Sequence, residues 1–523
     1  VGLSLPLGIQ AIIGLIQGAQ VSTSWIILVL LVTLGVIFSG ALQLMQLRII
    51  ETLQQRIFMK ASFEFSYRFP KIKMKELQNY YPPELANRFF DTLTIQKGLS
   101  KILIDFPAAA LQILFGLILL SLYHPFFILY GLLLVALIYF IFKFTAKKGL
   151  ETSLFESHAK YKVAHWIQEI ARSNISFKLS GSTRLAMQRN DQYTTEYLEY
   201  REKHFRVLVS QFIQLIGFKV MVTAGLLVVG GLLVLNQQLN IGQFVAAEII
   251  ILLVISSIEK LIVGLETFYD VLTSLEKIGH VTDKALDKQE GVDPFLTKDT
   301  LQIETEAIGF TTPEGRTILQ DITFKIDQGD RILLQGTPGS GKTTLLKIIS
   351  GLMNPTAGIL YINNSSSKGI HLNAYRARIG QVLTEQSPFE GTILENITFG
   401  NPDISAEAIH DCLQQLNLQE FVKSQENGLQ TIIYPEGKQL SQTVSRKLML
   451  ARAIIHAPKL LVLRDPLEHF EESEATQIVT YLMSPERPWA VIVTSQNPNW
   501  KPFCNKELVL TNGILTFNNS KNA

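Results

Sequence analysis

The segment Gly336-Thr-Pro-Gly-Ser-Gly-Lys-Thr343 is the most informative stretch of this sequence. It matches the pattern G-x-x-x-x-G-K-[S/T], in which glycines let the backbone wrap around the phosphates of a bound nucleotide. A strand-like stretch, Arg331–Gln335, precedes the motif, and a helix-like stretch, Thr343–Ser350, follows it. The motif requires both flanks, so the sequence predicts a phosphate-binding loop at a strand-to-helix junction rather than a chance match in a surface loop.

The loop and the first turn of the following helix are the candidate nucleotide site. We expect ATP to be held by Gly336, Thr337, Pro338, Gly339, Ser340, Gly341, Lys342, Thr343 and Thr344. Lys342 would reach the β- and γ-phosphates, and the Thr343 hydroxyl would face Mg²⁺ if a metal ion binds.

The first half of the chain consists largely of uncharged apolar segments. A membrane-spanning helix needs about 20 such residues. Six segments meet or approach this length: Val1–Gln17, Trp25–Met45, Phe106–Tyr123, Pro125–Phe142, Val220–Leu235 and Ile241–Ile258. The alternative is the buried helical core of a soluble protein, which a content of 47% hydrophobic and only 18% charged residues disfavours. We therefore expect six transmembrane helices, the first of them lacking its start because the chain opens inside an apolar run.

The charges between these segments predict the orientation in the membrane. The short connections Gly18–Ser24, Ser121–Phe126 and Asn236–Ile241 contain no Lys or Arg, whereas the two long connections contain many. Positively charged connections stay in the cytoplasm, so the long ones and the C-terminal domain are expected there. Three charged side chains, Lys219, Asp105 and Glu259, fall near the cytoplasmic interface. They are candidates for an ion-paired ring there, and the alternative is that they anchor their helices at the interface without a role in substrate binding.

These patterns predict four consecutive parts of the chain. They are a transmembrane domain over residues 1–283, a linker over 284–300, an α/β nucleotide-binding domain over 301–518 and a tail over 519–523. The net charge of +2 gives no case for a nucleic-acid partner. Two cysteines, Cys412 and Cys504, are too few for a disulfide framework and fit a reducing cytosolic setting.

Further motifs carry a resemblance to a known family. Phe389–Ile397, Leu440-Ser441, Leu450–Ala453 and Pro458–Leu463 resemble, in order and spacing, the segment after the Q-loop, the signature helix and the Walker B strand of ABC ATPases. With the membrane segments, the whole chain resembles one half of an ABC exporter, and most of all a type I protein-secretion transporter. That resemblance implies a homodimer or a heterodimer with another half-transporter, contact with membrane lipid, and a bacterial inner-membrane location. Because secretion-type exporters usually work with a periplasmic adaptor, an adaptor is a further candidate partner.

Several positions depart from the family pattern. The Walker B aspartate falls on Arg464, the catalytic glutamate on Asp465 and the switch histidine on Gln496. The signature motif reads Leu440–Val444 without its glycines. The Q-loop glutamine falls on Thr384, and the adenine-stacking aromatic residue falls on Thr312.

These departures predict a nucleotide site with impaired chemistry. A guanidinium has no acceptor, so Arg464 cannot ligate Mg²⁺, and we expect ATP binding to depend little on the metal. The alternative for Arg464 is a salt bridge to Asp465 or Glu468. Asp465 is the one candidate catalytic residue. The expected function is an exporter subunit that binds ATP with weak or absent hydrolysis, and the alternative is a non-hydrolysing regulatory or scaffold subunit.

Overall fold

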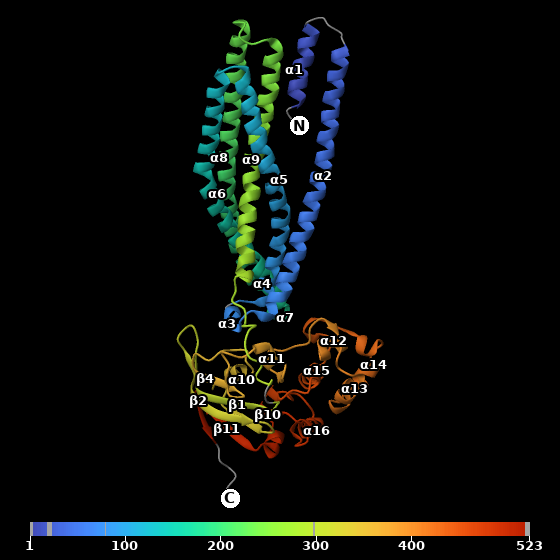
Figure 1. Cartoon of the computed structure of the whole chain (residues 1–523). Coiled ribbons are helices and arrows are strands. Elements are labelled where there is room, and N and C mark those ends of the chain that lie inside the picture. The colour runs from blue at the N-terminus through green and yellow to red at the C-terminus, as the bar shows by residue number, and fades with distance from the viewer. Residues whose placement is uncertain (1–3, 18–22, 79, 182, 297–298, 518–523) are drawn as a thin grey trace. The chain divides into compact units, whose positions relative to one another are not determined.

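A computed structural model describes residues 4–17, 23–78, 80–181, 183–296 and 299–517 (Figure 1). The chain divides into two compact units. Residues 1–71 and 79–284 make up the first, and residues 72–78 and 285–523 the second. The outer turn predicted at 18–24 lies mostly outside the described residues, and the tail predicted at 519–523 lies wholly outside them.

The first unit is helical. Its helices are α1 (Ser4–Gln17), α2 (Thr23–Arg68), α4 (Pro82–Ala86), α5 (Asp91–Tyr123), α6 (Phe126–Arg172), α7 (Asn174–Leu179), α8 (Leu185–Leu235) and α9 (Ile241–Thr282). Four helical stretches in the described part of the chain are long and apolar enough to cross a membrane: Thr23–Lys71, Pro82–Tyr123, Leu185–Leu235 and Ile241–Thr282. Pro6–Ile16 and Phe126–Ala136 are shorter apolar helical stretches at the two other predicted spans. The predicted helical transmembrane domain is confirmed.

Glycines allow α5 and α9 to pack closely against each other. Gly98 of α5 lies against Val271 of α9, and Gly116 of α5 lies against Val254. Gly264 of α9 in turn lies against the ring of Phe106. A Cβ atom at any of these glycines would overlap the facing side chain, so small residues set the distance between the two helices.

The second unit contains the strands. They are β1 (Gln302–Thr311), β2 (Thr317–Asp327), β3 (Arg331–Gly336), β4 (Ala357–Ile362), β5 (Ser365–Ser366), β6 (Ile379–Val382), β7 (Gly391–Thr392), β8 (Ile432–Ile433), β9 (Leu460–Arg464), β10 (Ala490–Thr494), β11 (Lys506–Thr511) and β12 (Ile514–Phe517). One sheet has the order β2-β1-β4-β5, and a larger sheet has the order β12-β11-β3-β10-β9-β6. In the larger sheet β11, β3, β10, β9 and β6 are parallel, and β3, β9 and β10 are buried apolar strands, as expected for a sheet covered on both faces.

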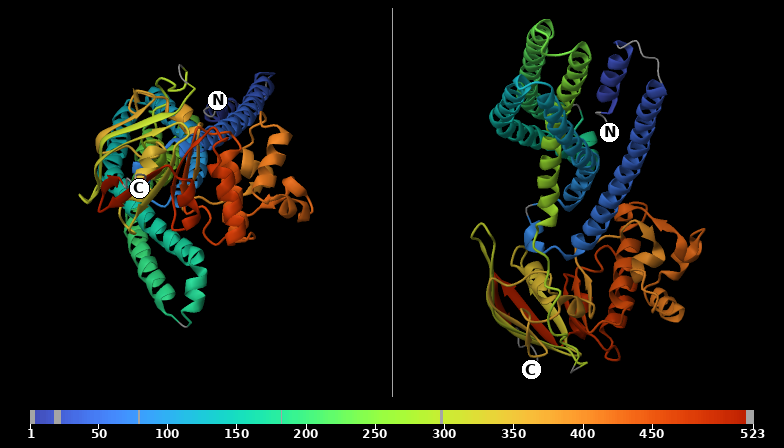
Figure 2. Two further views of the ribbon diagram at one scale, coloured as in Figure 1. Left: turned by 90° about the horizontal axis from the view of Figure 1, so that it is seen from below. Right: turned by 45° about the horizontal axis from the view of Figure 1, so that its top comes forward.

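Helices complete the second unit. They are α3 (Met74–Leu77), α10 (Lys342–Ile349), α11 (Leu372–Arg376), α12 (Ile393–Thr398), α13 (Ala406–Gln415), α14 (Gln419–Ser424), α15 (Gln442–Ile454) and α16 (Glu472–Met483). Within this unit the four-stranded sheet, in yellow, and the group α12 to α14, in orange, lie on opposite sides (Figure 2). Cys412 and Cys504 are both buried and unbridged.

The stretch predicted as a linker packs onto the second unit. Val292 forms a bridge with Ile370, and the Asp287 carboxylate pairs with Arg376 at 2.6 Å. Gly291 has a φ of 144°, and a Cβ there would overlap the backbone of Ile370, so only glycine fits. The short α3 segment also belongs to this unit, because Ile72 bridges Leu286.

Candidate nucleotide site

The parallel sheet gathers the predicted site residues at one edge. In register, Leu463 of β9 lies beside Val493 of β10, and Val493 lies beside Leu333 of β3. The carboxyl ends of these strands therefore meet, which is where parallel α/β sheets bind ligands. The predicted phosphate-binding loop follows β3, Arg464 ends β9, and Gln496 follows β10.

The loop has the conformation that its glycines predict. Gly336, Gly339 and Gly341 have φ values of 149°, 81° and 102°, a region that side chains with a Cβ atom rarely adopt. A Cβ on Gly336 would overlap the carbonyl group of Leu510. The Ser340 hydroxyl oxygen is buried and has no hydrogen-bond partner within the described chain. A concave backbone with an unpaired hydroxyl, at the start of the eight-residue helix α10, suits a phosphate group.

Lys342 projects its ammonium group over the loop. The Nζ atom donates hydrogen bonds to the carbonyl oxygens of Gly336 at 2.7 Å and Thr337 at 2.9 Å. Burial lowers the pKa of Lys342, the positive charge of Arg464 lowers it further, and the Asp465 carboxylate opposes both effects. Arg464 is thus close enough for its charge to act on the lysine that the motif assigns to the phosphates.

Arg464 turns toward the loop. Its Nη1 atom donates a short hydrogen bond to the Oγ1 atom of Thr343, the residue that the motif assigns to the metal. The alternative pairing with Asp465 is weak, because the closest approach, from Nε to the carboxylate, is 4.0 Å. The guanidinium is therefore anchored on the predicted metal-facing hydroxyl.

Asp465 begins the segment after β9 in a left-handed conformation, with a φ of 42°. Burial raises the pKa of its carboxyl, the Glu468 carboxylate raises it further, and the charges of Arg464 and Lys342 oppose the shift. The backbone of Gln496 forms a hydrogen bond with the Asp465 side chain. Asp465 and Gln496 are thus neighbours, as the sequence register requires.

The residues of this site do not suit Mg²⁺. Magnesium takes oxygen ligands in a nearly octahedral arrangement. The Thr343 oxygen, which the motif assigns to the metal, accepts a hydrogen bond from Arg464. Arg464 also stands at the position where the family pattern leads us to expect a metal-binding carboxylate. No group of three or more His, Cys, Asp or Glu residues in the described chain could hold a metal ion.

Two further positions that the sequence singles out are Thr384 and Thr312. Thr384 lies in an exposed turn, and Gln386, two residues further on, uses its Oε1 atom to accept the backbone N–H of Leu383 at 3.1 Å. Thr312 lies in the turn between β1 and β2, whereas Phe310 is 9% exposed and packs in the core. No aromatic residue stands in that turn, Thr312–Arg316.

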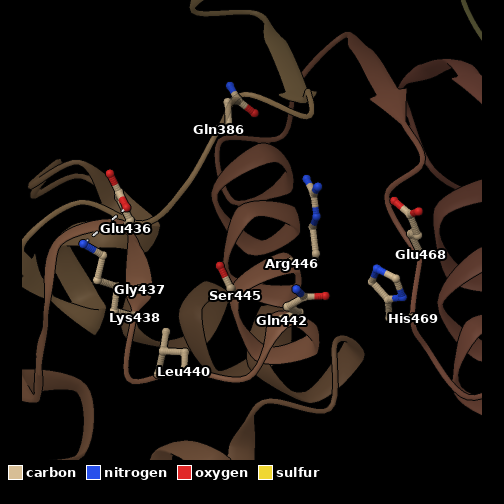
Figure 3. Close-up of a pocket in the computed structure, with 10 residues that line it drawn as sticks. All are labelled: Gln386, Glu436, Gly437, Lys438, Leu440, Gln442, Ser445, Arg446, Glu468 and His469. Atoms are coloured by element: carbon tan, nitrogen blue, oxygen red, sulfur yellow. Dashed lines mark ion pairs between the residues drawn. The ribbon is translucent and has the colours of Figure 1, made fainter. Parts of the chain in front are cut away.

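The segment Leu440–Val444, predicted to be the signature segment, borders a pocket of about 400 Å³. In Figure 3, Gln442, Ser445 and Arg446 of α15 lie opposite Glu468 and His469, which follow β9. Ser441 caps α15, since its hydroxyl accepts the Val444 N–H at 3.2 Å. In the register predicted from the sequence, Gln442 and Thr443 fall where the family has glycines, and side chains there would obstruct close backbone approach by a phosphate.

The sequence does not predict the α3 segment. The α3 segment borders a pocket of about 450 Å³, lined among others by Lys73, Met74, Phe310 and Met353. The resemblance to ABC exporters instead implies that Tyr80–Leu85 and His165–Arg172, in the long connections between membrane segments, are the segments that couple the two domains, and these remain predictions. In α3, four helical residues give too short a pattern to detect.

The expected pairing of charges at the membrane interface is found in part. Lys219 of α8 pairs with Glu259 of α9 at 2.5 Å. Among the described residues, Asp105 forms no ion pair with Lys219.

Comparisons with known proteins show which proteins this chain resembles. Residues 319–468 match the family model described as ABC transporter. The chain is 27% identical over 307 residues to the alpha-hemolysin translocation ATP-binding protein HlyB of Escherichia coli, covering 58% of this chain and 43% of that protein. It is 29% identical over 282 residues to the ATP-dependent lipid A-core flippase of Burkholderia orbicola, covering 52% and 46%. The matched part of this chain thus spans less than half the length of either relative.

A solved structure extends the comparison to the whole fold. A bacterial Atm1-family ABC exporter with ATP bound superposes with a TM-score of 0.85 at 15% identity, over 98% of this chain and 91% of that one. The fold is therefore that of an ABC exporter with fused domains, in which an N-terminal helical transmembrane domain precedes an α/β ABC nucleotide-binding domain, as the sequence predicts.

Proposed function

We propose that this chain is a subunit of a membrane ABC exporter that binds ATP, works as a dimer and hydrolyses ATP weakly or not at all. The ABC exporter fold and the intact phosphate loop support export and ATP binding. The hydrogen bond from Arg464 to Thr343 is the observation that carries the weak hydrolysis, because it puts a guanidinium where hydrolysis needs a metal-binding carboxylate.

The dimer follows from how half-transporters of this kind work. ATP is held between two nucleotide-binding domains, and each domain contributes a phosphate loop to one site and a signature segment to the other. The partner is a second copy of this chain or another half-transporter. Either way this chain brings Arg464 to one site and Gln442 and Thr443 to the other, so both sites are impaired. The relatives carry different cargo by name, hemolysin in one and lipid A-core in another, and single out no cargo here.

The second candidate is a non-hydrolysing regulatory or scaffold subunit that binds ATP as a signal. The impairment of both composite sites favours it over a motor. The two candidates differ in what ATP does to the dimer. An exporter dimer must bring its two nucleotide-binding domains together when ATP binds, whereas a scaffold need not.

The test uses the full chain in lipid nanodiscs. We expect ATP to bind while turnover stays at background and is unchanged in Asp465→Asn. Brisk turnover that Asp465→Asn abolishes would contradict weak hydrolysis. A spin label at Glu420, whose side chain is 88% exposed, reports the distance between two copies. ATP-induced shortening of that distance supports the exporter, and an unchanged distance in a dimer supports the scaffold.

A further inference from the structure

The nucleotide site carries two cations on the phosphate side. Lys342 lies over the loop, and Arg464 is anchored beside it through the Thr343 hydroxyl. Asp465 lies near both, but its carboxylate approaches Arg464 only to 4.0 Å, and the Glu468 carboxylate lies near Asp465. Glu385, the next carboxylate, is engaged by Lys347 at 2.8 Å. Two cations therefore lie on the phosphate side of the loop before any nucleotide arrives.

A nucleoside triphosphate reaches such a site either free or as its magnesium complex. The free form carries about two more negative charges, because Mg²⁺ neutralises two of them when it bridges the β- and γ-phosphate oxygens. Two fixed cations attract the more negative form more strongly. A guanidinium also matches a phosphate with parallel N–H groups, so Arg464 can take the phosphate contacts that the metal makes elsewhere.

The metal complex meets a further obstacle. Its Mg²⁺ would lie against Thr343, whose oxygen already accepts a hydrogen bond from Arg464. Bound metal and guanidinium would then compete for one place, and their like charges repel at short range. Binding the complex requires Arg464 to leave its anchor, which the free nucleotide does not require.

We propose that Arg464 makes this site selective for metal-free nucleoside triphosphate, so that Mg²⁺ weakens binding instead of strengthening it. The inference rests on the proposed function, since it presumes that ATP binds at the loop. It names Arg464 as the specificity-determining residue and metal-free ATP as the ligand.

The experiment is a pair of ATP titrations on the full chain in nanodiscs, one with Mg²⁺ in excess over ATP and one with excess chelator. Added NaCl equalises the ionic strength, so that screening is the same in both. We expect Kd to be at least about tenfold lower with the chelator. A lower Kd with Mg²⁺, or equal values, would overturn the selectivity. Absence of ATP binding in both titrations would instead overturn the proposed function.

Two variants assign the effect to Arg464. Arg464→Asp should reverse the preference, because a carboxylate supplies a metal ligand and removes a cation. Arg464→Gln should weaken binding with chelator and leave little difference between the two conditions. The unfolding temperature of each variant checks that it is folded. If Arg464→Gln keeps the preference of the unmodified chain for metal-free ATP, Arg464 is not its source and the proposal fails.

Discussion

Replacing Lys342 tests the phosphate loop most directly. The Nζ atom donates to two neutral carbonyl oxygens, and a bound phosphate would exchange both bonds for bonds to an anion. A hydrogen bond from a cation to a neutral acceptor contributes about 1.5 kcal/mol and a bond between two ions about 3 kcal/mol. Two exchanged bonds therefore favour binding by about 3 kcal/mol, so Lys342→Ala should weaken ATP binding about 150-fold.

The assay is a titration with a fluorescent ATP analogue on the full chain. Lys347→Ala is the matched control, because Lys347 lies on the same helix but its ammonium pairs with Glu385 at 2.8 Å. We expect the control to bind nearly as well as the unmodified chain. Equal affinity of Lys342→Ala and the unmodified chain would refute the assignment of this loop to the phosphates.

Three further predictions concern stability and topology. Arg331 is 5% exposed and its guanidinium donates to six backbone carbonyl groups, so Arg331→Met should cost about 3 kcal/mol and lower the calorimetric unfolding temperature of the nucleotide-binding domain by about 6 °C or more. The folded-state pKa of Asp465 is raised, so ionisation there destabilises the fold once the pH exceeds the unfolded pKa. Asp465→Asn should therefore raise the unfolding temperature near neutral pH, with a gain that shrinks as the pH falls toward the unfolded pKa, and a gain independent of pH would contradict this. Cysteines at Thr23 and Gln237 should react with a membrane-impermeant thiol reagent from outside the cell, and reaction from the cytosolic side alone would overturn the predicted orientation.

The sequence predicts most of the fold because its strongest signals are local. Uncharged runs such as Trp25–Met45 identify a membrane helix by composition alone, and the glycines from Gly336 to Gly341 specify their own loop. Arg464 could likewise be placed by counting from the buried strand Leu460–Leu463, since a single strand fixes that register.

Other features depend on residues far apart in the chain. The sequence offers Asp465 or Glu468 as the partner of Arg464 and does not point to Thr343, because Thr343 becomes its neighbour only when β3, β10 and β9 align. Ile72 belongs to the second unit because it forms a β-bridge with Leu286. No pattern in the sequence around Ile72 predicts a pairing with a residue so far along the chain.

The glycine contacts between α5 and α9 restrict how these helices can move. From Gly98 to Gly116, α5 advances about 27 Å, and along this length a glycine on one helix repeatedly faces a bulky side chain on the other. Sliding by one residue would shift every contact together by about 1.5 Å, driving Val271, Phe106 and Val254 against neighbouring turns that offer no such space. Translation of one helix along the other is thus blocked. A conformational change of the first unit must therefore move α5 and α9 together as a rigid pair, with the bending at other positions in the chain.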